Sequence, residues 1–118
     1  MERSKKLSRI AITEFSDIVV RIEITDRLRI HLIDGSFLDV WFSRSIPGKY
    51  AYHWESRHVS GEVFRWDNAA HRKWRHIRTY PHHCHYGRKD NVKEFSPEKT
   101  DENTLRKIMK FIRKRLQQ

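Results

Sequence analysis

Apolar and polar residues alternate through the first half of this chain, and that period of two constrains its fold more than any other feature. Between positions 17 and 68 the even-numbered residues are apolar over long stretches, as in Ile18, Val20, Ile22 and Ile24. Strict alternation is typical of β-strands that bury one face. The pattern predicts five strands, near residues 18–24, 27–33, 37–43, 49–56 and 62–67.

Short turns between the predicted strands indicate how neighbouring strands pair. A three-residue loop at positions 34–36 would place Leu32 opposite Leu38, and a similar loop after Ile24 would place that residue opposite Leu28. Both loops keep the apolar residues on one side of the sheet. A two-residue turn at positions 34–35 would instead place apolar residues opposite polar ones. We therefore expect antiparallel hairpins with three-residue loops.

A second periodicity, near the C-terminus, predicts a helix. Thr100 can cap its first turn, and Asp101 and Glu102 suit the positive end of the helix dipole. Its apolar residues recur at helical spacing: Leu105, Ile108, Met109, Ile112 and Leu116. Apolar residues between positions 7 and 15 allow a further short helix. We expect an α+β fold whose five-stranded antiparallel sheet packs its even-residue face on the C-terminal helix and leaves the other face open.

Length and composition predict a small intracellular protein. Its 118 residues suit one domain, residues 1–118. No apolar run approaches the roughly 18 residues that span a bilayer, and residues 1–9 lack the apolar core of a signal peptide. The single cysteine, Cys84, excludes an internal disulfide framework. We therefore expect a cytoplasmic protein with no membrane partner.

Positive charge is concentrated in the C-terminal part of the chain. The formal net charge is +10, and residues 71–118 hold 14 Lys and Arg against 5 Asp and Glu. A one-sided positive field attracts polyanions and supplies phosphate contacts. A nucleic acid is the expected partner. RNA is favoured over DNA, because an open sheet face suits the stacking of single-stranded bases.

Candidate RNA-binding residues fall into three groups. Arg29 and Trp41 occupy odd positions of the predicted strands and so belong to the open face. Further candidates follow the last strand or lie on the outer side of the C-terminal helix: Asn68, Arg72, Lys73 and His82, and Arg106, Lys107 and Lys110. Cross-strand ion pairs and cations at the end of the helix explain part of this charge without any ligand.

Histidines are concentrated in the middle of the chain, where seven of the eight lie between positions 53 and 85. Pro81 is incompatible with a helix interior, so the run His82-His83-Cys84-His85 is assigned to a loop or an edge strand. In an extended segment His83 and His85 point to one side and His82 to the other. So many imidazoles in so short a stretch indicate a chemical role, because histidine contributes little apolar burial.

Metal-free RNA cleavage is the favoured chemistry for this region. It requires a base for the 2′-hydroxyl, an acid for the leaving oxygen and a cation at the phosphate, and histidine and arginine suit these roles at neutral pH. His53, Arg65 and Asp67 share the odd-residue face of the predicted sheet. The histidines after residue 70 are expected to fold back beside Asp67. The predicted catalytic residues are His53, Arg65, Asp67, His71, His83 and His85.

Three alternatives stay open for the same residues. His83 and His85, with Asp67 or His71, offer imidazole and carboxylate ligands suited to zinc, manganese or nickel. The histidines could instead form a structural cluster. Cys84, flanked by histidines, is a candidate nucleophile. The favoured interpretation requires no cofactor and no metal.

Four ordered blocks of sequence carry a resemblance to a known family. They are Ile33-Asp34-Gly35-Ser36-Phe37-Leu38, Tyr50-Ala51-Tyr52-His53-Trp54, Arg65-Trp66-Asp67-Asn68-Ala69-Ala70-His71 and Tyr80-Pro81-His82-His83-Cys84-His85. Together they resemble the TumE family of toxins over about residues 17–112. The chain departs from the family pattern at three positions: Ala70 stands for proline, Arg72 for a second histidine, and Cys84 for the usual lysine.

The resemblance implies a type II toxin that is encoded beside a DNA-binding antitoxin and acts on RNA. The matching positions are His53, Arg65, Asp67, Asn68, His71, His82, His83 and His85. The expected function is a growth inhibitor that cleaves or binds RNA through a His/Arg/Asp cluster. Its expected partners are RNA and a cognate antitoxin, and a homodimer is allowed. The alternatives are a non-catalytic nucleic-acid-binding module and a metal-dependent nuclease or phosphodiesterase.

Overall fold

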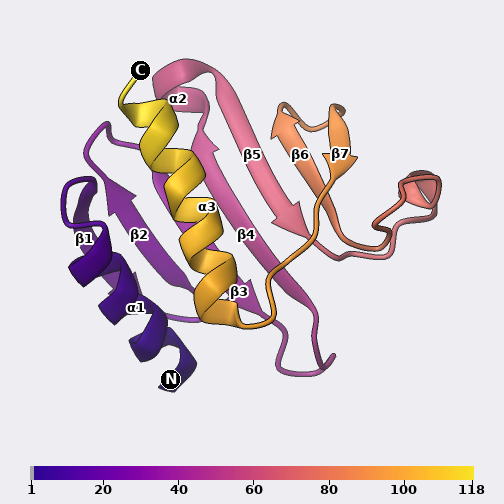
Figure 1. The fold of residues 1–118 in the computed structure, drawn as a ribbon, viewed down its shortest axis with the longest axis horizontal. Helices are drawn as coiled ribbons and strands as arrows, with labels where there is room; N and C mark the ends of the chain where they lie inside the picture. The colour runs from indigo at the N-terminus through magenta and orange to yellow at the C-terminus, as the bar shows by residue number, and fades with distance from the viewer. Residues whose placement is uncertain (1) are drawn as a thin grey trace.

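The computed structural model describes residues 2–118, and it contains a single antiparallel sheet packed on two long helices (Figure 1). The strands lie in the order of the sequence: β1 (Val19–Ile24), β2 (Leu28–Leu32), β3 (Phe37–Phe42), β4 (Tyr50–Ser56), β5 (Glu62–Asp67), β6 (His83–Gly87) and β7 (Val92–Glu94). The helices are α1 (Glu2–Glu14), a single turn α2 (Arg57–Ser60), the 3-10 turn η1 (Arg72–Trp74) and α3 (Asp101–Leu116).

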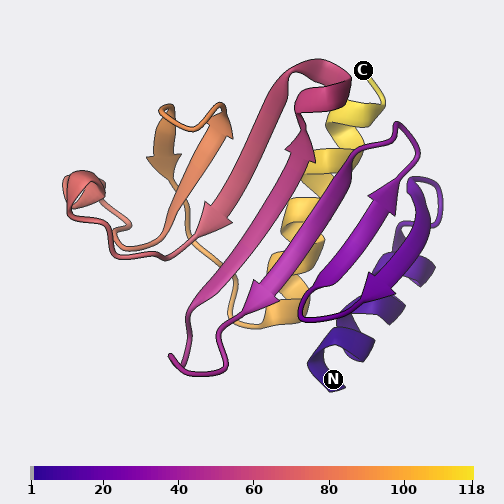
Figure 2. The same cartoon turned by 180° about the vertical axis from the view of Figure 1, so that it is seen from behind.

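Both long helices, α1 and α3, cover the same face of the sheet, and no long helix within residues 2–118 covers the other face (Figures 1 and 2). The α+β class, the antiparallel pairing and the C-terminal helix on the even-residue face are as predicted. Even-numbered residues of β2 to β5 fill the core together with the apolar side of α3: Leu28, Ile30, Leu38, Val40, Tyr52, Trp54, Phe64, Trp66, Leu105, Ile108, Met109 and Ile112. The N-terminal helix is longer than the short one that the sequence predicts, and it buries Leu7, Ile10 and Ala11.

Local capping explains why α3 begins where the sequence predicts. The Thr100 hydroxyl accepts a hydrogen bond from the backbone N–H of Asn103 at 3.1 Å, which satisfies one of the unpaired donors of the first turn. Basic residues occupy the last turn, where the helix dipole favours cations. Within residues 2–118, no helix is long and apolar enough to cross a membrane.

The prediction of five strands is wrong, because two further strands extend the sheet. β6 pairs with β5, and β7 pairs with β6. β6 has five residues and β7 only three. Such short segments contain too few alternating positions to stand out from a loop. This extension matters for function, because β6 carries His83 and His85 alongside the end of β5.

The predicted register between β2 and β3 is shifted by two residues. Leu38 lies opposite Ile30 instead of Leu32, because the strand pairing already begins at Ser36, whose carbonyl accepts from the Leu32 N–H. Ser36 is held there by Asp34, whose side chain accepts from its N–H at 3.0 Å. A register shift of two residues leaves every side chain on the same face of the sheet, because side chains alternate between the faces with period two.

The pairing of β1 with β2 is as predicted at Ile24 and Leu28. At the start of β1 the register shifts between Val19 and Arg21. This bulge turns Val20 outward, and the residue is 65% exposed although its even position predicts burial.

Candidate functional site

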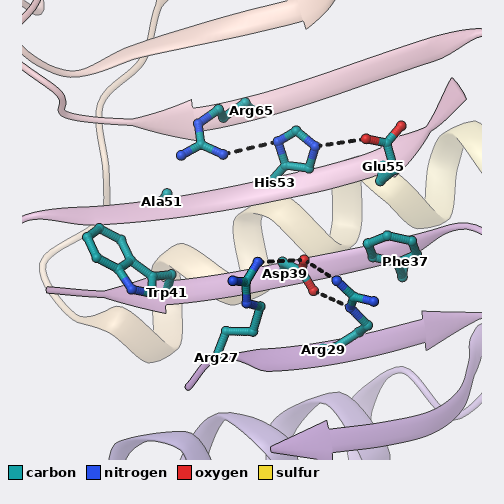
Figure 3. A pocket seen from close by; sticks show the side chains of 9 residues that line it. All are labelled: Arg27, Arg29, Phe37, Asp39, Trp41, Ala51, His53, Glu55 and Arg65. Carbon is teal, nitrogen blue, oxygen red and sulfur yellow. Dashed lines mark hydrogen bonds and ion pairs between the residues drawn. The ribbon is translucent and has the colours of Figure 1, made fainter. Parts of the chain in front are cut away.

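The open face of the sheet is hollowed between β2 and β5 (Figure 3). This first hollow has a volume of about 470 Å³ and is lined by Arg27, Arg29, Phe37, Asp39, Trp41, Ala51, His53, Glu55 and Arg65. A second hollow of about 330 Å³ lies toward β6 and η1 and shares His53 and Arg65 with the first. These two side chains therefore form the boundary between the hollows.

His53, on β4, lies at the centre of a row of three polar side chains (Figure 3). Its Nδ1 accepts a hydrogen bond from Nη1 of Arg65 at 3.1 Å, and its Nε2 lies 3.1 Å from Oε1 of Glu55. Because a guanidinium only donates, Nδ1 must carry the lone pair, and the ring proton lies on Nε2, which donates to Glu55. His53 is thus held as one defined neutral tautomer.

Burial lowers the pKa of His53 below its ordinary value of 6.5, and the nearby Arg65 lowers it further, while Glu55 and Asp39 oppose the shift. The Glu55 carboxylate is itself held ionised. Hydrogen bonds from Arg57, and then from His53, lower the pKa of Glu55 to about 2 against the desolvation that raises it. A neutral imidazole oriented by a carboxylate is the arrangement of a general base. Glu55 was not among the predicted site residues, although its place two residues after His53 put it on the same face.

Asp67 ends β5 and is only 4% exposed. Its Oδ2 accepts from Nε of Arg65 at 3.1 Å, and its Oδ1 accepts from the Ala69 N–H at 2.9 Å. Two imidazoles of β6 complete its surroundings: Nε2 of His83 lies 3.2 Å from Oδ1, and Nε2 of His85 lies 3.7 Å from Oδ2. The expectation that this segment folds back beside Asp67 therefore agrees with the structure for His83 and His85.

The two β6 histidines are oriented by the backbone. Nδ1 of His83 donates to the Pro81 carbonyl at 2.8 Å, and Nδ1 of His85 donates to the Lys89 carbonyl at 2.7 Å. Their Nε2 atoms face each other at 3.2 Å. Asp67, His83 and His85 are the residues of the described chain, 2–118, whose ligand atoms converge as a metal would require, within 4.8 Å of one another.

Trp74 in η1 forms one wall of the second hollow. Its ring lies 6.0 Å from that of His85 in an edge-on arrangement and 6.4 Å from that of His83. Sequence reasoning missed this residue, because η1 has no periodicity that separates a functional aromatic residue from a loop residue. Lys73 lies over the indole at 5.0 Å, so the wall is both aromatic and cationic.

His71 does not join the cluster around Asp67. It caps η1, where its Nδ1 accepts from the Lys73 N–H at 3.1 Å, and its side chain is exposed. The prediction that His71 lies beside Asp67 is wrong, because capping the 3-10 turn holds the ring on the outer loop. Arg72 and Lys73 are also exposed on this loop.

Asn68 and His82 have structural partners. The Asn68 amide accepts from the Tyr50 N–H at 3.0 Å and donates to the Gly48 carbonyl at 2.8 Å, which links two turns. His82 stacks on the Tyr50 ring, with Nδ1 3.0 Å from the phenol oxygen. These contacts occupy the Asn68 amide and Nδ1 of His82, both of which the sequence offered for RNA contact.

Arg29 and Trp41 lie on the open face as predicted, but their neighbours differ from those expected. Arg29 makes a bidentate pair with Asp39, at 2.7 and 2.9 Å, and Trp41 lies opposite Ala51. With Leu32 opposite Leu38, as predicted, Arg29 would have lain opposite Trp41, and the shift of two residues places Asp39 there instead.

The predicted cations of the C-terminal helix lie on the other side of the sheet from His53. Arg106 pairs with Glu14 at 2.8 Å, and Lys107 binds the Ser96 carbonyl at 2.8 Å. Lys110 is exposed. The candidate RNA-binding residues therefore divide between two opposite surfaces of the molecule.

Cys84 points into the core, away from its histidine neighbours. It is 4% exposed, and burial raises the pKa of its thiol to about 12. A thiol that remains protonated and buried is a poor nucleophile. The structure therefore disfavours the cysteine alternative.

Comparison with known proteins gives one match. Neither the curated proteins nor the solved structures include one with significant similarity to this chain. A family model described as Toxin TumE matches residues 6–116, nearly the whole chain. The match includes the open face, both hollows and the Asp67–His83–His85 cluster. The chain belongs to the TumE toxin family.

Proposed function

We propose that this toxin inhibits growth by cleaving single-stranded RNA on the open face of its sheet, with His53 as general base and Arg65 as phosphate ligand. The observation that carries the proposal is the row Glu55–His53–Arg65 at the boundary of the two hollows. It combines a neutral imidazole, a carboxylate that orients it and a fixed cation. The imidazole and the cation are the base and the phosphate ligand that cleavage by a 2′-hydroxyl requires, and water supplies the acid.

The hydrogen bonds of His53 suggest how RNA starts the reaction. In the free protein the Nδ1 lone pair is occupied by Arg65. A phosphate would attract the guanidinium, because charge-assisted bonds to an anion are stronger than a bond to a neutral ring. The lone pair would then be free to take the proton of the 2′-hydroxyl.

The reaction then follows from general chemistry. The 2′-oxygen attacks phosphorus, the bond to the 5′-oxygen breaks, and that oxygen takes a proton from water in the open hollow. The products are a 2′,3′-cyclic phosphate and a 5′-hydroxyl. Arg65 stabilises the charge that develops on the phosphate oxygens.

Aromatic and cationic side chains on either side of His53 support binding of a single strand. Phe37 and Trp41 line the first hollow, and Trp74 lines the second together with Lys73 and Lys89. Stacking on aromatic rings contributes about 1–3 kcal/mol per base and tolerates most sequences. Base-paired RNA hides these faces, so we expect a preference for unpaired RNA.

The test uses a single-stranded RNA oligonucleotide, its DNA counterpart, and an RNA with a 2′-deoxy nucleotide at the mapped cleavage site. We expect cleavage of the RNA, no cleavage of the DNA or at the deoxy nucleotide, and products with a 2′,3′-cyclic phosphate. His53→Ala should reduce the rate by about 100-fold, the usual effect of losing a general base. Equal cleavage of DNA, or products with a 3′-hydroxyl, would exclude the mechanism.

Membership of a toxin family also supports a cognate antitoxin as protein partner. We propose that the antitoxin neutralises the toxin by direct binding. Co-expression of the protein encoded beside the toxin gene should restore growth, and the two chains should co-purify. Restored growth without a complex would contradict neutralisation by binding.

A further inference from the structure

We propose that Asp67, His83 and His85 bind one divalent transition-metal ion of the zinc type, with an open coordination position toward the second hollow. The sequence favoured a site without metal and left Asp67 and His71 as alternative third ligands. The strand pairing supports Asp67, because it lies directly opposite His83. The inference does not depend on RNA cleavage.

The two imidazoles of His83 and His85 are oriented with their Nε2 atoms toward a common point. In both rings Nδ1 donates to a backbone carbonyl, so in the neutral ring the lone pair must lie on Nε2. Both lone pairs then point at each other and toward the Asp67 carboxylate. With both rings neutral, no hydrogen lies between these electron-pair donors, so they repel one another, and a cation at their centre would remove that repulsion.

Backbone carbonyls that accept from Nδ1 are also the usual outer partners of metal-bound histidines. They set the tautomer and the ring orientation and make the coordinating nitrogen a better ligand. Asp67 is supported in the same way by Arg65 and by the Ala69 N–H. Each proposed ligand therefore has a second partner that holds it in place.

The separations between the proposed ligand atoms also suit a zinc ion. Zinc binds imidazole nitrogen and carboxylate oxygen at about 2.0–2.2 Å, so two ligand atoms of a tetrahedral site lie about 3.3–3.6 Å apart. Here the two Nε2 atoms are 3.2 Å apart, and Nε2 of His83 lies 3.2 Å from Oδ1 of Asp67. The distance from Nε2 of His85 to Oδ2 is 3.7 Å. These distances involve both oxygens of Asp67, so the site is close to the required size when the carboxylate offers Oδ1 and Oδ2 together.

The proposed ligands are largely buried, but one of them borders the second hollow. The side chains of Asp67 and His83 are 5% and 2% exposed, whereas that of His85 is 16% exposed and lines the second hollow. Three protein ligands leave the fourth tetrahedral position to water or substrate. Two nitrogens and one carboxylate favour zinc, manganese, cobalt or nickel over magnesium and calcium, which prefer oxygen ligands.

The experiment measures metal binding by the full chain. Protein freed of metal with a chelator and then dialysed is titrated with Zn²⁺, Co²⁺ and Mg²⁺ by isothermal calorimetry, and metal content is measured by mass spectrometry. We expect one Zn²⁺ per chain, the strong visible absorption of tetrahedral Co²⁺, and no comparable Mg²⁺ binding. Zinc should also raise the thermal unfolding temperature, because it binds only the folded site.

The variants separate this site from adventitious binding. His85→Ala should weaken zinc affinity by at least about 100-fold and abolish the Co²⁺ absorption, since a ligand matters at least as much as its outer partner. His76→Ala is the matched control: it removes an exposed histidine outside the cluster and should leave zinc affinity unchanged. Circular dichroism establishes that each variant is folded.

Three results would overturn the proposal. They are no zinc bound by the wild-type chain, equal affinity in folded His85→Ala, and loss of binding in His76→Ala. His83→Gln, which keeps a polar group at the most buried ligand position, serves as the second ligand variant if His85→Ala fails to fold. Unchanged affinity in that variant would also overturn the proposal.

Discussion

The open face carries two Arg–Asp pairs that both occupy odd-numbered strand positions but have different surroundings. On β2 and β3, Arg29 and Asp39 form a bidentate pair across the strands, at 2.7 and 2.9 Å. On β5, Arg65 reaches Asp67 through Nε alone, at 3.1 Å, and its Nη1 turns to His53. The first pair satisfies its own hydrogen-bonding groups, whereas the second belongs to a larger polar network.

This difference indicates which of the two carboxylates has neighbours that could bind a ligand. Around Asp39 the charges are balanced by Arg29 and by Arg27 at 3.5 Å. Around Asp67 two imidazoles turn their Nε2 atoms toward each other at 3.2 Å and toward the carboxylate, with Arg65 as the neighbouring cation. Buried polar networks that are incompletely satisfied cost stability, and functional sites often carry such a cost. The following predictions test this contrast.

The largest difference between the two pairs is expected when each arginine is replaced by lysine, which keeps the charge but loses the planar fork. Arg65→Lys should lower the single-turnover rate of RNA cleavage by about 100-fold, comparable to the loss of one donor to a developing anion. Arg29→Lys should change that rate by less than about threefold. Equal losses in both variants would remove the functional distinction between the pairs.

The pH dependence of cleavage should report the environment of His53. Its side chain faces Arg65, Glu55 and Asp39, and its pKa lies below 6.5 mainly because of burial. Only the neutral ring accepts a proton, so activity should fall as the pH decreases through that lowered pKa and should stay high above it. Glu55→Gln removes a group that raises the pKa of His53, so the acidic limb should move to still lower pH. The maximal rate should fall about tenfold as the ring loses its orientation.

Glu94→Gln is the matched control for the pH profile, because Glu94 pairs with Arg78 at the β7 edge. It should leave the profile unchanged. An acidic limb above pH 6.5 in the wild-type protein, or one that moves upward in Glu55→Gln, would contradict a base with the properties of His53.

RNA affinity should depend on the side of the sheet that is changed. Charge reversal of Lys73 and Lys89, beside the second hollow, should weaken binding about tenfold. It should also reduce the salt dependence by about 0.7 in the logarithmic slope per lost phosphate contact. Reversal of Lys107 and Lys110 on α3 should change affinity less than about twofold. Fluorescence anisotropy at several salt concentrations measures both, and the reverse order would place RNA on the helical side.

The smallest effect concerns stability in the presence of a chelator. Arg29→Leu should lower the free energy of unfolding by about 1–3 kcal/mol, because Asp39 loses its bidentate partner. His85→Leu should change it by less than about 0.5 kcal/mol or increase it, because one of two opposed lone pairs is removed. Urea unfolding measures both values. A loss in His85→Leu as large as that in Arg29→Leu would mean that the Asp67 cluster is satisfied without an ion.

Alternation along the strands was sufficient to predict the class of fold and the shared face of His53, Arg65 and Asp67. It could not predict the β2–β3 register, in which the Asp34 side chain holds Ser36 where its carbonyl accepts from the Leu32 N–H. Any shift by two residues satisfies the same pattern, so the pattern alone does not discriminate between such registers.

The finer features of the site arise from backbone atoms that a pattern of side chains does not contain. The carbonyls of Pro81 and Lys89 decide where the imidazole protons lie. The capping of η1 decides that His71 stays on the outer loop while Trp74 approaches the cluster. Residue type and spacing identified the histidines as candidates. Only their contacts in the structure distinguish His53, the proposed base, from His83 and His85, the proposed metal ligands. The same contacts show that His71 caps η1.

The contact of α1 with α3 joins the first and the last element of the described fold and has a consequence for synthesis on the ribosome. Each strand pairs with its sequence neighbour, so hairpins can form as the chain emerges. The apolar face of the sheet, however, stays uncovered until α3 has been made, because Leu105, Ile108 and Met109 complete the core. Domains generally fold as units during translation. The core of the toxin is therefore complete only after α3 has been synthesised.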